Sequence, residues 1–224
     1  MCGRFTLTVD PSELQDVLPF ATVAADATWA PRYNIAPTQP VAVVANNGKN
    51  ALEFFRWGLI PSWAKDSSIG NRMINARAET LAEKPSFRNA FKRRRCLIPA
   101  DGFYEWRKDS ASKTPMYVRL KSGEPFAFAG LWEAWRAPDG KTVLSCAIIT
   151  TTPNSLMEKI HDRMPVILKP DAYERWIDPA ESDPEALGRL LKPYPASHMT
   201  AHAVSKLVNK PENDSPQCVV PVKR

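Results

Sequence analysis

Short runs of apolar residues, separated by polar turn segments, dominate the chain. Val41–Ala45 and Leu52–Ile60 flank the turn NNGKN, and this arrangement predicts a β-hairpin. Further strands are expected at Cys96–Trp106, Met116–Leu120, Phe126–Trp135, Val143–Thr150, Met164–Leu168 and Ala201–Val204. The turn segments KDSASKTP, KSGEP and APDGK separate the strands expected between residues 96 and 150. The pattern therefore predicts a strand-rich protein.

The helices expected from the same pattern are short, and several begin with a capping residue or proline. They are Ser12–Leu18, Ser86–Arg94, Ser155–Ile160, Asp171–Ile177 and Pro184–Leu191. Strands joined mostly by hairpins, with short peripheral helices, favour an α+β fold over a doubly wound sheet. Because no repeat or linker divides the sequence, we expect residues 1–224 to form a single domain.

Composition and charge limit the classes of function. Hydrophobic residues make up 44% and charged residues 24%, as in ordinary soluble proteins. No stretch reaches the ~20 apolar residues of a membrane span and no signal-peptide core is present, so a cytoplasmic protein without membrane association is expected. The formal net charge of +6 favours a polyanionic partner such as nucleic acid but does not establish one.

The four cysteines, Cys2, Cys96, Cys146 and Cys218, lie far apart without a CxxC motif. This spacing argues against a disulfide scaffold and a structural zinc site, and we expect neither a metal nor a cofactor. Cys96 and Cys146 stand in apolar runs and are expected to be inert core residues. Cys2 differs, because removal of Met1 would leave a free α-amine and a thiol on one residue.

Two loop-like segments contain candidate binding residues. RYNIAPTQ (Arg32–Gln39) is either a structured connection or a loop in which Arg32 and Asn34 direct donors at a ligand. In WGLIPSWAKD, Trp57 closes an apolar strand and is expected in the core. Trp63 stands in a polar loop without an obvious burial partner. An exposed ring there could stack on unpaired bases, with ~1–3 kcal/mol per base, but the local sequence alone favours a role without stacking.

Two polar segments allow a structural and a functional interpretation. In NARAET, Asn75, Arg77 and Glu79 share one face if the segment is extended, but taken alone the stretch favours a solvated strand edge. The run KRRR (Lys92–Arg95) ends an expected helix, where cations suit the helix dipole, and a solvated face is expected there.

Glu105 and His161 are the candidate acid–base residues. Glu105 stands between aromatics in DGFYEW, where burial would raise the pKa of its carboxyl toward the range of a general acid. Its side chain could instead leave the sheet for water. His161 lies in the charged start of IHDRMPVIL. It has a role beyond structure only if Cys2 or Glu105 reaches it.

In chain order, MCGRF, RYNIAPTQ, WGLIPSW, NARAET, CLIPADGFYEW, IHDRMPVIL and VNKPENDSP resemble the SRAP family. The matching segments run from residue 2 to about residue 218. This family contains abasic-site processing proteins that crosslink to damaged single-stranded DNA. The resemblance implies a curved or barrel-like, mostly antiparallel sheet assembly with short flanking helices, in agreement with the expected strands.

The resemblance also implies roles for single residues. Cys2 matches the crosslinking nucleophile, Asn75 a residue that contacts the opened sugar, Glu105 the acid–base carboxylate and His161 the histidine near the sugar hydroxyl. The positions that hold the DNA backbone or wedge beside the lesion match Arg4, Asn34, Trp63, Arg77 and Arg163. The sequence departs from the pattern after Trp63, where Ala64 stands and a second adjacent aromatic is missing.

The first residues suit this chemistry. An abasic site equilibrates with a ring-opened aldehyde, and an α-amine with a pKa of roughly 7.7–8.0 is partly neutral near pH 7. The amine attacks the aldehyde to give an imine, and the thiol of the same residue closes a five-membered thiazolidine. Met1 must first be removed, by an aminopeptidase or by the protein itself. β-Elimination from the imine would add weak lyase activity.

Two rival functions fit the same residues. Cys2 and His161 could form a thiol peptidase, and Arg4, Trp63 and Arg77 could form a non-covalent single-strand-binding module. We expect the partner to be single-stranded DNA with abasic sites, bound by a monomer that requires no protein partner and associates with the nucleoid through DNA.

Overall fold

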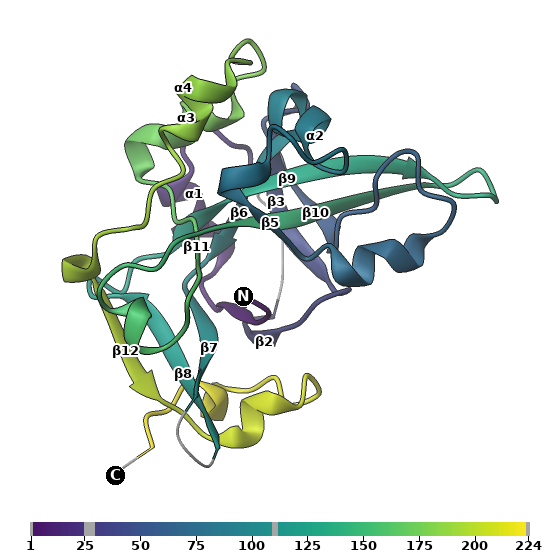
Figure 1. Cartoon of the computed structure of the whole chain (residues 1–224). Helices are drawn as coiled ribbons and strands as arrows, with labels where there is room; N and C mark the ends of the chain where they lie inside the picture. Colours follow the sequence, from purple (N-terminus) through teal and green to yellow (C-terminus); the bar gives the residue numbers. More distant parts are fainter. Residues whose placement is uncertain (1, 25–29, 109–111, 223–224) are drawn as a thin grey trace.

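The computed structural model describes residues 2–24, 30–108 and 112–222, in which the strands form two sheets (Figure 1). Neighbouring strands of the first sheet are antiparallel. Its order is β12 (Met199–Ala203), β8 (Lys113–Leu120), β7 (Gly102–Lys108), β1 (Phe5–Leu7) and β2 (Arg32–Ile35).

The second sheet closes on itself and forms a barrel. Its circuit consists of β10 (Thr142–Thr151), β4 (Leu52–Trp57), β3 (Pro40–Ala45), β6 (Arg95–Ala100) and β9 (Phe126–Arg136). The β9–β10 pairing closes the circuit, and β10 also pairs with β5 (Asn75–Arg77) and β11 (Met164–Pro165). Pairing is antiparallel except where β10 meets β4 and β5. The expected α+β, mostly antiparallel fold is confirmed.

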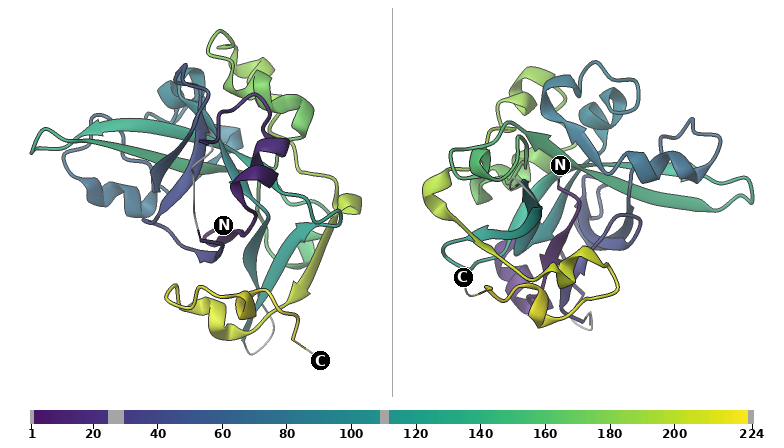
Figure 2. Two further views of the ribbon diagram at one scale, coloured as in Figure 1. Left: turned by 180° about the vertical axis from the view of Figure 1, so that it is seen from behind. Right: turned by 60° about the horizontal axis from the view of Figure 1, so that its bottom comes forward.

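Short helices flank the sheets (Figure 2). The α-helices are α1 (Pro11–Val17), α2 (Arg88–Arg93), α3 (Tyr173–Ile177) and α4 (Pro184–Gly188). The 3-10 helices are η1 (Ser67–Arg72), η2 (Ala78–Thr80), η3 (Met157–Lys159), η4 (Pro170–Ala172), η5 (Ala196–His198), η6 (Lys206–Asn209) and η7 (Pro216–Cys218). No helix in the described ranges is long and apolar enough to cross a membrane.

The strand expected at Cys96–Trp106 is wrong as a single element. The chain turns at Asp101, so that β6 belongs to the barrel and β7 to the open sheet. The buried carboxylate of Asp101 accepts hydrogen bonds from the hydroxyls of Thr6 and Thr8 and from the N–H of Thr8. These bonds satisfy the carboxylate at a point where the pattern of apolar residues gives no sign of a corner.

Other expectations are corrected in detail. RYNIAPTQ is not wholly a loop, because its first half forms β2. Ser155–Ile160 contains only the 3-10 helix η3. Arg95, expected on a solvated face, is fully buried, and its guanidinium donates to backbone carbonyls at the ends of α2 and α3. Met1 and residues 109–111, part of the turn expected within KDSASKTP, lie outside the described residues.

β1 joins the open sheet to the barrel core. The Phe5 ring contacts Trp57 and Phe128 edge-on, at centroid distances of 5.1 and 5.8 Å. Trp57, Cys96 and Cys146 are fully buried, as the sequence predicts. Because β1 begins three residues after Cys2, this packing places the first residues of the chain between the two sheets (Figure 1).

Candidate functional site

Asn75 connects the barrel to the first described residue. Its strand β5 pairs with β10, where Asn75 lies opposite Ile148. From this position the Nδ2 atom of Asn75 donates a hydrogen bond to the Cys2 carbonyl at 2.8 Å. The Oδ1 atom of Asn75 is buried and accepts no hydrogen bond from the described residues. It is therefore available to a ligand that brings a hydroxyl donor.

The Cys2 thiol is held as a neutral group. Cys2 is fully buried, and its Sγ lies 3.8 Å from the carbonyl oxygen of Arg4. Burial raises the pKa of the thiol, and the Glu105 carboxylate raises it further. A thiolate is consequently disfavoured in this environment.

Glu105 is buried in β7 with only 2% of its surface exposed, so its side chain does not leave the sheet for water. Burial raises the pKa of its carboxyl, and His161 opposes this shift. The Nε2 atom of His161 lies 4.0 Å from Oε2 of Glu105. The structure therefore joins two residues that the sequence singled out separately.

The backbone fixes the ring of His161. Its Nδ1 accepts a hydrogen bond from the N–H of Arg163 at 3.0 Å. Nδ1 also lies 2.8 Å from the Asp162 carboxylate, which would require a proton on the same nitrogen. The Asp162 side chain is 87% exposed and well solvated, so we assign the backbone bond as the determining one. With Nδ1 as the acceptor of this bond, the ring nitrogen that carries a proton is Nε2, which faces Glu105.

The predicted DNA-binding residues are placed differently from one another. Arg77 is exposed where β5 ends, and Trp63 has an exposed fraction of 59%. Arg163 makes a two-pronged ion pair with Glu79 at 2.8 and 2.9 Å and also donates to the Thr150 carbonyl. Arg163 is thus already engaged by protein groups.

Arg4 and Asn34 bind a later segment of the chain. The Nη1 atom of Arg4 donates to Oδ1 of Asn34 at 2.8 Å and to the Val208 carbonyl. The buried Asn34 amide donates to the carbonyls of Val208, Lys210 and Asn213. Both side chains hold the segment 206–213 beside β1 and β2.

The sequence interpretation missed Asp214, which fixes the same segment. Its carboxylate accepts hydrogen bonds from the N–H groups of Tyr33 and Asn34 and from Nε of Arg32. The Nε donor of Arg32 is therefore already bonded to a protein carboxylate. An acidic residue in the polar segment VNKPENDSP was the available signal, but its distance in sequence from RYNIAPTQ hides the contact.

A cavity of about 600 Å³ adjoins His161. Trp106, Arg107, Lys108 and Lys159 line it together with Pro153, Glu158, Ile160 and Asp162. A substrate bound in this cavity would contact the imidazole ring of His161. The sequence interpretation did not single out these cationic residues, because Lys159 and Arg107 come from separate elements.

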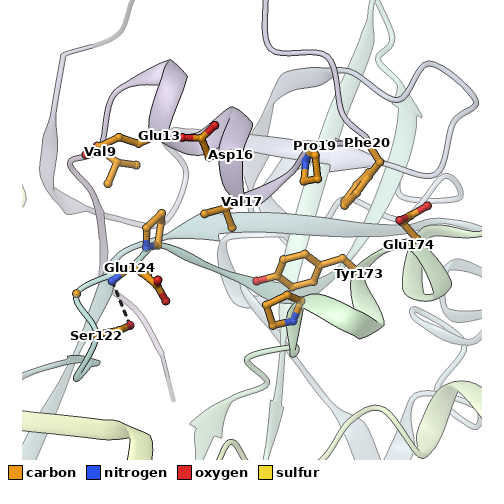
Figure 3. A pocket seen from close by; sticks show the side chains of 13 residues that line it. Val9, Glu13, Asp16, Val17, Pro19, Phe20, Ser122, Glu124, Tyr173 and Glu174 are labelled. Atoms are coloured by element: carbon orange, nitrogen blue, oxygen red, sulfur yellow. Dashed lines mark hydrogen bonds between the residues drawn. The ribbon is translucent and has the colours of Figure 1, made fainter.

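A larger cavity, of about 750 Å³, lies between α1, the β8–β9 turn and α3, away from these residues (Figure 3). Glu13, Asp16, Glu124 and Glu174 carry the charged side chains of its lining, together with apolar side chains such as Phe20. Four carboxylates repel phosphates. Its size alone therefore does not make it the site for a nucleic acid.

The family model described as SOS response associated peptidase (SRAP) matches residues 1–211. The chain is 50% identical to the abasic site processing protein YoqW of Bacillus subtilis, covering 98% of this chain and 99% of that protein. It is 30% identical to the abasic site processing protein HMCES of Xenopus tropicalis, covering 99% of this chain and 78% of that protein.

A crystal structure of a protein from Bacteroides thetaiotaomicron has the same fold. It superimposes with a TM-score of 0.89 at 27% sequence identity, covering 99% of this chain and all of that one. The likeness extends over both sheets and over the elements that bring Cys2, Asn75, Glu105 and His161 together.

Proposed function

This chain belongs to the SRAP family, and on that basis we propose that it processes abasic sites in DNA by forming a covalent bond with the lesion. The reacting residue is Cys2, once Met1 has been removed. The substrate is the ring-opened aldehyde of an abasic site in single-stranded DNA. The protein acts as one domain and as a monomer.

The reaction proceeds in two bond-forming steps. The neutral α-amine of Cys2 adds to the aldehyde carbon, and loss of water gives an imine. The thiol then adds to the same carbon, its proton passes to the nitrogen, and a thiazolidine ring closes. Both nucleophiles share one residue, so the second step is intramolecular and proximity favours it.

Glu105, His161 and Asn75 serve the steps that the nucleophiles cannot perform. The raised pKa of the Glu105 carboxyl favours its protonated form, which can give a proton to the departing water. His161 exchanges protons with the sugar hydroxyl, and the Asn75 amide orients the sugar oxygen. Elimination from the imine, before the ring closes, gives a weak lyase activity.

The observation that carries the proposal is the Asn75 hydrogen bond to the Cys2 carbonyl beside the buried Glu105. This contact fixes the backbone of the reacting residue without engaging its nitrogen or sulfur. A residue placed only for packing would not need a half-buried amide from the barrel to hold its carbonyl.

The thiol environment argues against a peptidase as the main activity. A cysteine peptidase needs a thiolate, which a neighbouring cation or imidazolium stabilises. Here burial and Glu105 raise the pKa of the Cys2 thiol. We therefore expect no cleavage of other proteins, and Met1 is removed either by an aminopeptidase or by the protein itself.

Denaturing electrophoresis tests the proposal. Purified protein is mixed with a single strand in which uracil has been converted to an abasic site. A slower band that survives denaturant is expected with the wild type and not with Cys2→Ala. Salt-sensitive binding of Cys2→Ala to the same strand should persist, since the arginines remain. Wild-type protein without an adduct, or with an N-terminus that stays blocked, would contradict the proposal.

A further inference from the structure

The segment that carries Trp63 runs along the β9–β10 hairpin, which projects from the barrel (Figure 1). At its start, the N–H of Gly58 donates to the Cys146 carbonyl at 2.8 Å. Two residues later, the N–H of Ile60 donates to Oγ of Ser145 at 2.8 Å. Alternate residues of the segment are thus attached to the hairpin.

The attachment continues on both sides of Trp63. The backbone of Ser62 faces the Glu133 carboxylate closely enough to oppose the rise in the pKa of that carboxyl that burial causes. The indole Nε1 of Trp135 donates to the Ala64 carbonyl at 2.7 Å. Glu133 and Trp135 are each only 5% exposed, so both anchors are fixed in the hairpin. Trp63, between the anchored residues, is left with 59% of its surface exposed.

A tight turn closes the loop at the same place. The N–H of Ala64 donates to the Pro61 carbonyl at 2.9 Å, which places Trp63 at the tip. An exposed indole buries little apolar surface, so Trp63 contributes little to the stability of the free protein. Because the loop already restricts the ring, less conformational entropy is lost when a flat ligand stacks on it.

We propose that Trp135, supported by Glu133, is a positioning residue that holds Trp63 ready to stack on a base next to the abasic site. This inference rests on the proposed function. It also explains how one ring serves where Ala64 leaves no second adjacent aromatic, because two anchors restrict the motion of the single ring.

The test uses a single strand with 2-aminopurine beside a tetrahydrofuran analogue of the abasic site, which has no aldehyde. Stacking of Trp63 quenches the fluorescence of 2-aminopurine. Trp135→Phe keeps an aromatic ring in the hairpin and removes the N–H donor. We expect it to lose this quenching and to weaken binding about fivefold or more, the lower end of the effect of one stacked base.

Trp132→Phe is the matched control. Trp132 lies on the same hairpin, but its Nε1 donates to Oδ1 of Asn46 at 2.9 Å and not to the Trp63 loop. Loss of the Trp132 N–H donor in this variant should leave the quenching of 2-aminopurine and the DNA affinity as in the wild type. With reactive abasic strands, Trp135→Phe should raise the half-saturating DNA concentration and leave the maximal adduct rate unchanged.

A double-mutant cycle decides whether Trp135 acts through Trp63. Trp63→Ala and Trp135→Phe should each lose the quenching, and the double variant should bind no more weakly than Trp63→Ala. Losses that multiply, or quenching by Trp135→Phe equal to that of Trp132→Phe, would overturn the proposal. If Trp135→Phe does not fold, Glu133→Met removes the other anchor and should give the same losses.

The analogue also separates this inference from the proposed function. Absence of adduct with reactive DNA, combined with Trp135-dependent quenching on the analogue, would reject the covalent chemistry and keep the positioning role. Adduct formation by the wild type without any quenching would reject the positioning role and keep the covalent chemistry.

Discussion

At Glu105, burial opposes ionisation and makes folding depend on pH. A carboxyl whose pKa is raised in the folded state binds its proton more tightly there than in the unfolded chain. Stability therefore falls as pH rises from the ordinary value of the group toward the raised one. We expect Glu105→Gln to melt at a higher temperature than the wild type at pH 8, with little difference at pH 4. An equal loss at both pH values would contradict this prediction.

The same substitution separates chemistry from binding. Gln cannot supply the proton that the departing water needs, whereas the groups that hold DNA are unchanged. Glu105→Gln should slow adduct formation more than it weakens binding of the abasic strand. Rates at saturating DNA and affinities on the unreactive analogue measure the two effects. Equal losses in both would remove Glu105 from the reaction.

Asn75→Asp replaces the donor that holds Cys2 with an acceptor. A carboxylate at this position repels the Cys2 carbonyl oxygen that Nδ2 now binds at 2.8 Å, so the reacting residue shifts. Adduct formation should fall by about 100-fold, since misplacement of a reacting group by ~1 Å has such an effect. Asn71→Asp is the control, because exposed Asn71 accepts from Arg56 and can continue to do so. A full rate for Asn75→Asp would show that its donor is not needed.

Among the elements, Arg95 connects α2 and α3 to the barrel. Its guanidinium donates to five backbone carbonyls: those of Phe91, Lys92, Trp176, Asp178 and Glu181. An ammonium group has three donors and cannot reproduce this fork. Arg95→Lys should lower the free energy of unfolding by at least about 2 kcal/mol, since buried carbonyls lose their partners. The exposed Arg93→Lys should change it little, and equal urea midpoints for the two variants would refute the prediction.

Elements with a clear period of apolar residues were predictable. The β3–β4 hairpin and the long strands β9 and β10 appear where the sequence placed them, although β4 ends at Trp57 and not at Ile60. The three-residue strand β1 was not predicted, and β5 was anticipated only as an extended stretch or strand edge without a partner, because three residues are too few for a period and pairing with distant strands defines both. The corner at Asp101 was missed for a similar reason, since distant threonines stabilise it.

For the site, residue types were predictable but their partners were not. The sequence indicated Glu105 and His161 by their unusual surroundings, and the structure brings them within 4.0 Å. Asn34 was expected at a ligand, yet its amide holds the segment 206–213, because only the folded chain brings those carbonyls beside β2. A polar side chain in a sequence motif thus predicts a hydrogen bond better than it predicts the partner.

For the whole molecule, the net charge of +6 does not describe each part of the surface. The cavity between α1 and α3 contains four carboxylates, whereas Arg77 is exposed at the end of the strand that carries Asn75. Salt screens charges that lie more than ~10 Å from a bound strand, so a DNA strand beside Arg77 should respond mainly to charges along its path. Local charge, rather than the total, should therefore control its binding.

Paired charge changes on the two sides test this. Arg77→Ala should weaken binding of a single strand carrying the unreactive analogue and reduce the slope of log affinity against log salt by about one, as expected for one lost phosphate contact. Glu174→Gln raises the net charge by one on the acidic cavity and should leave that slope unchanged. If the two variants change the slope by equal amounts in opposite directions, the strand responds to total charge. In that case a path beside Arg77 has no support from electrostatics.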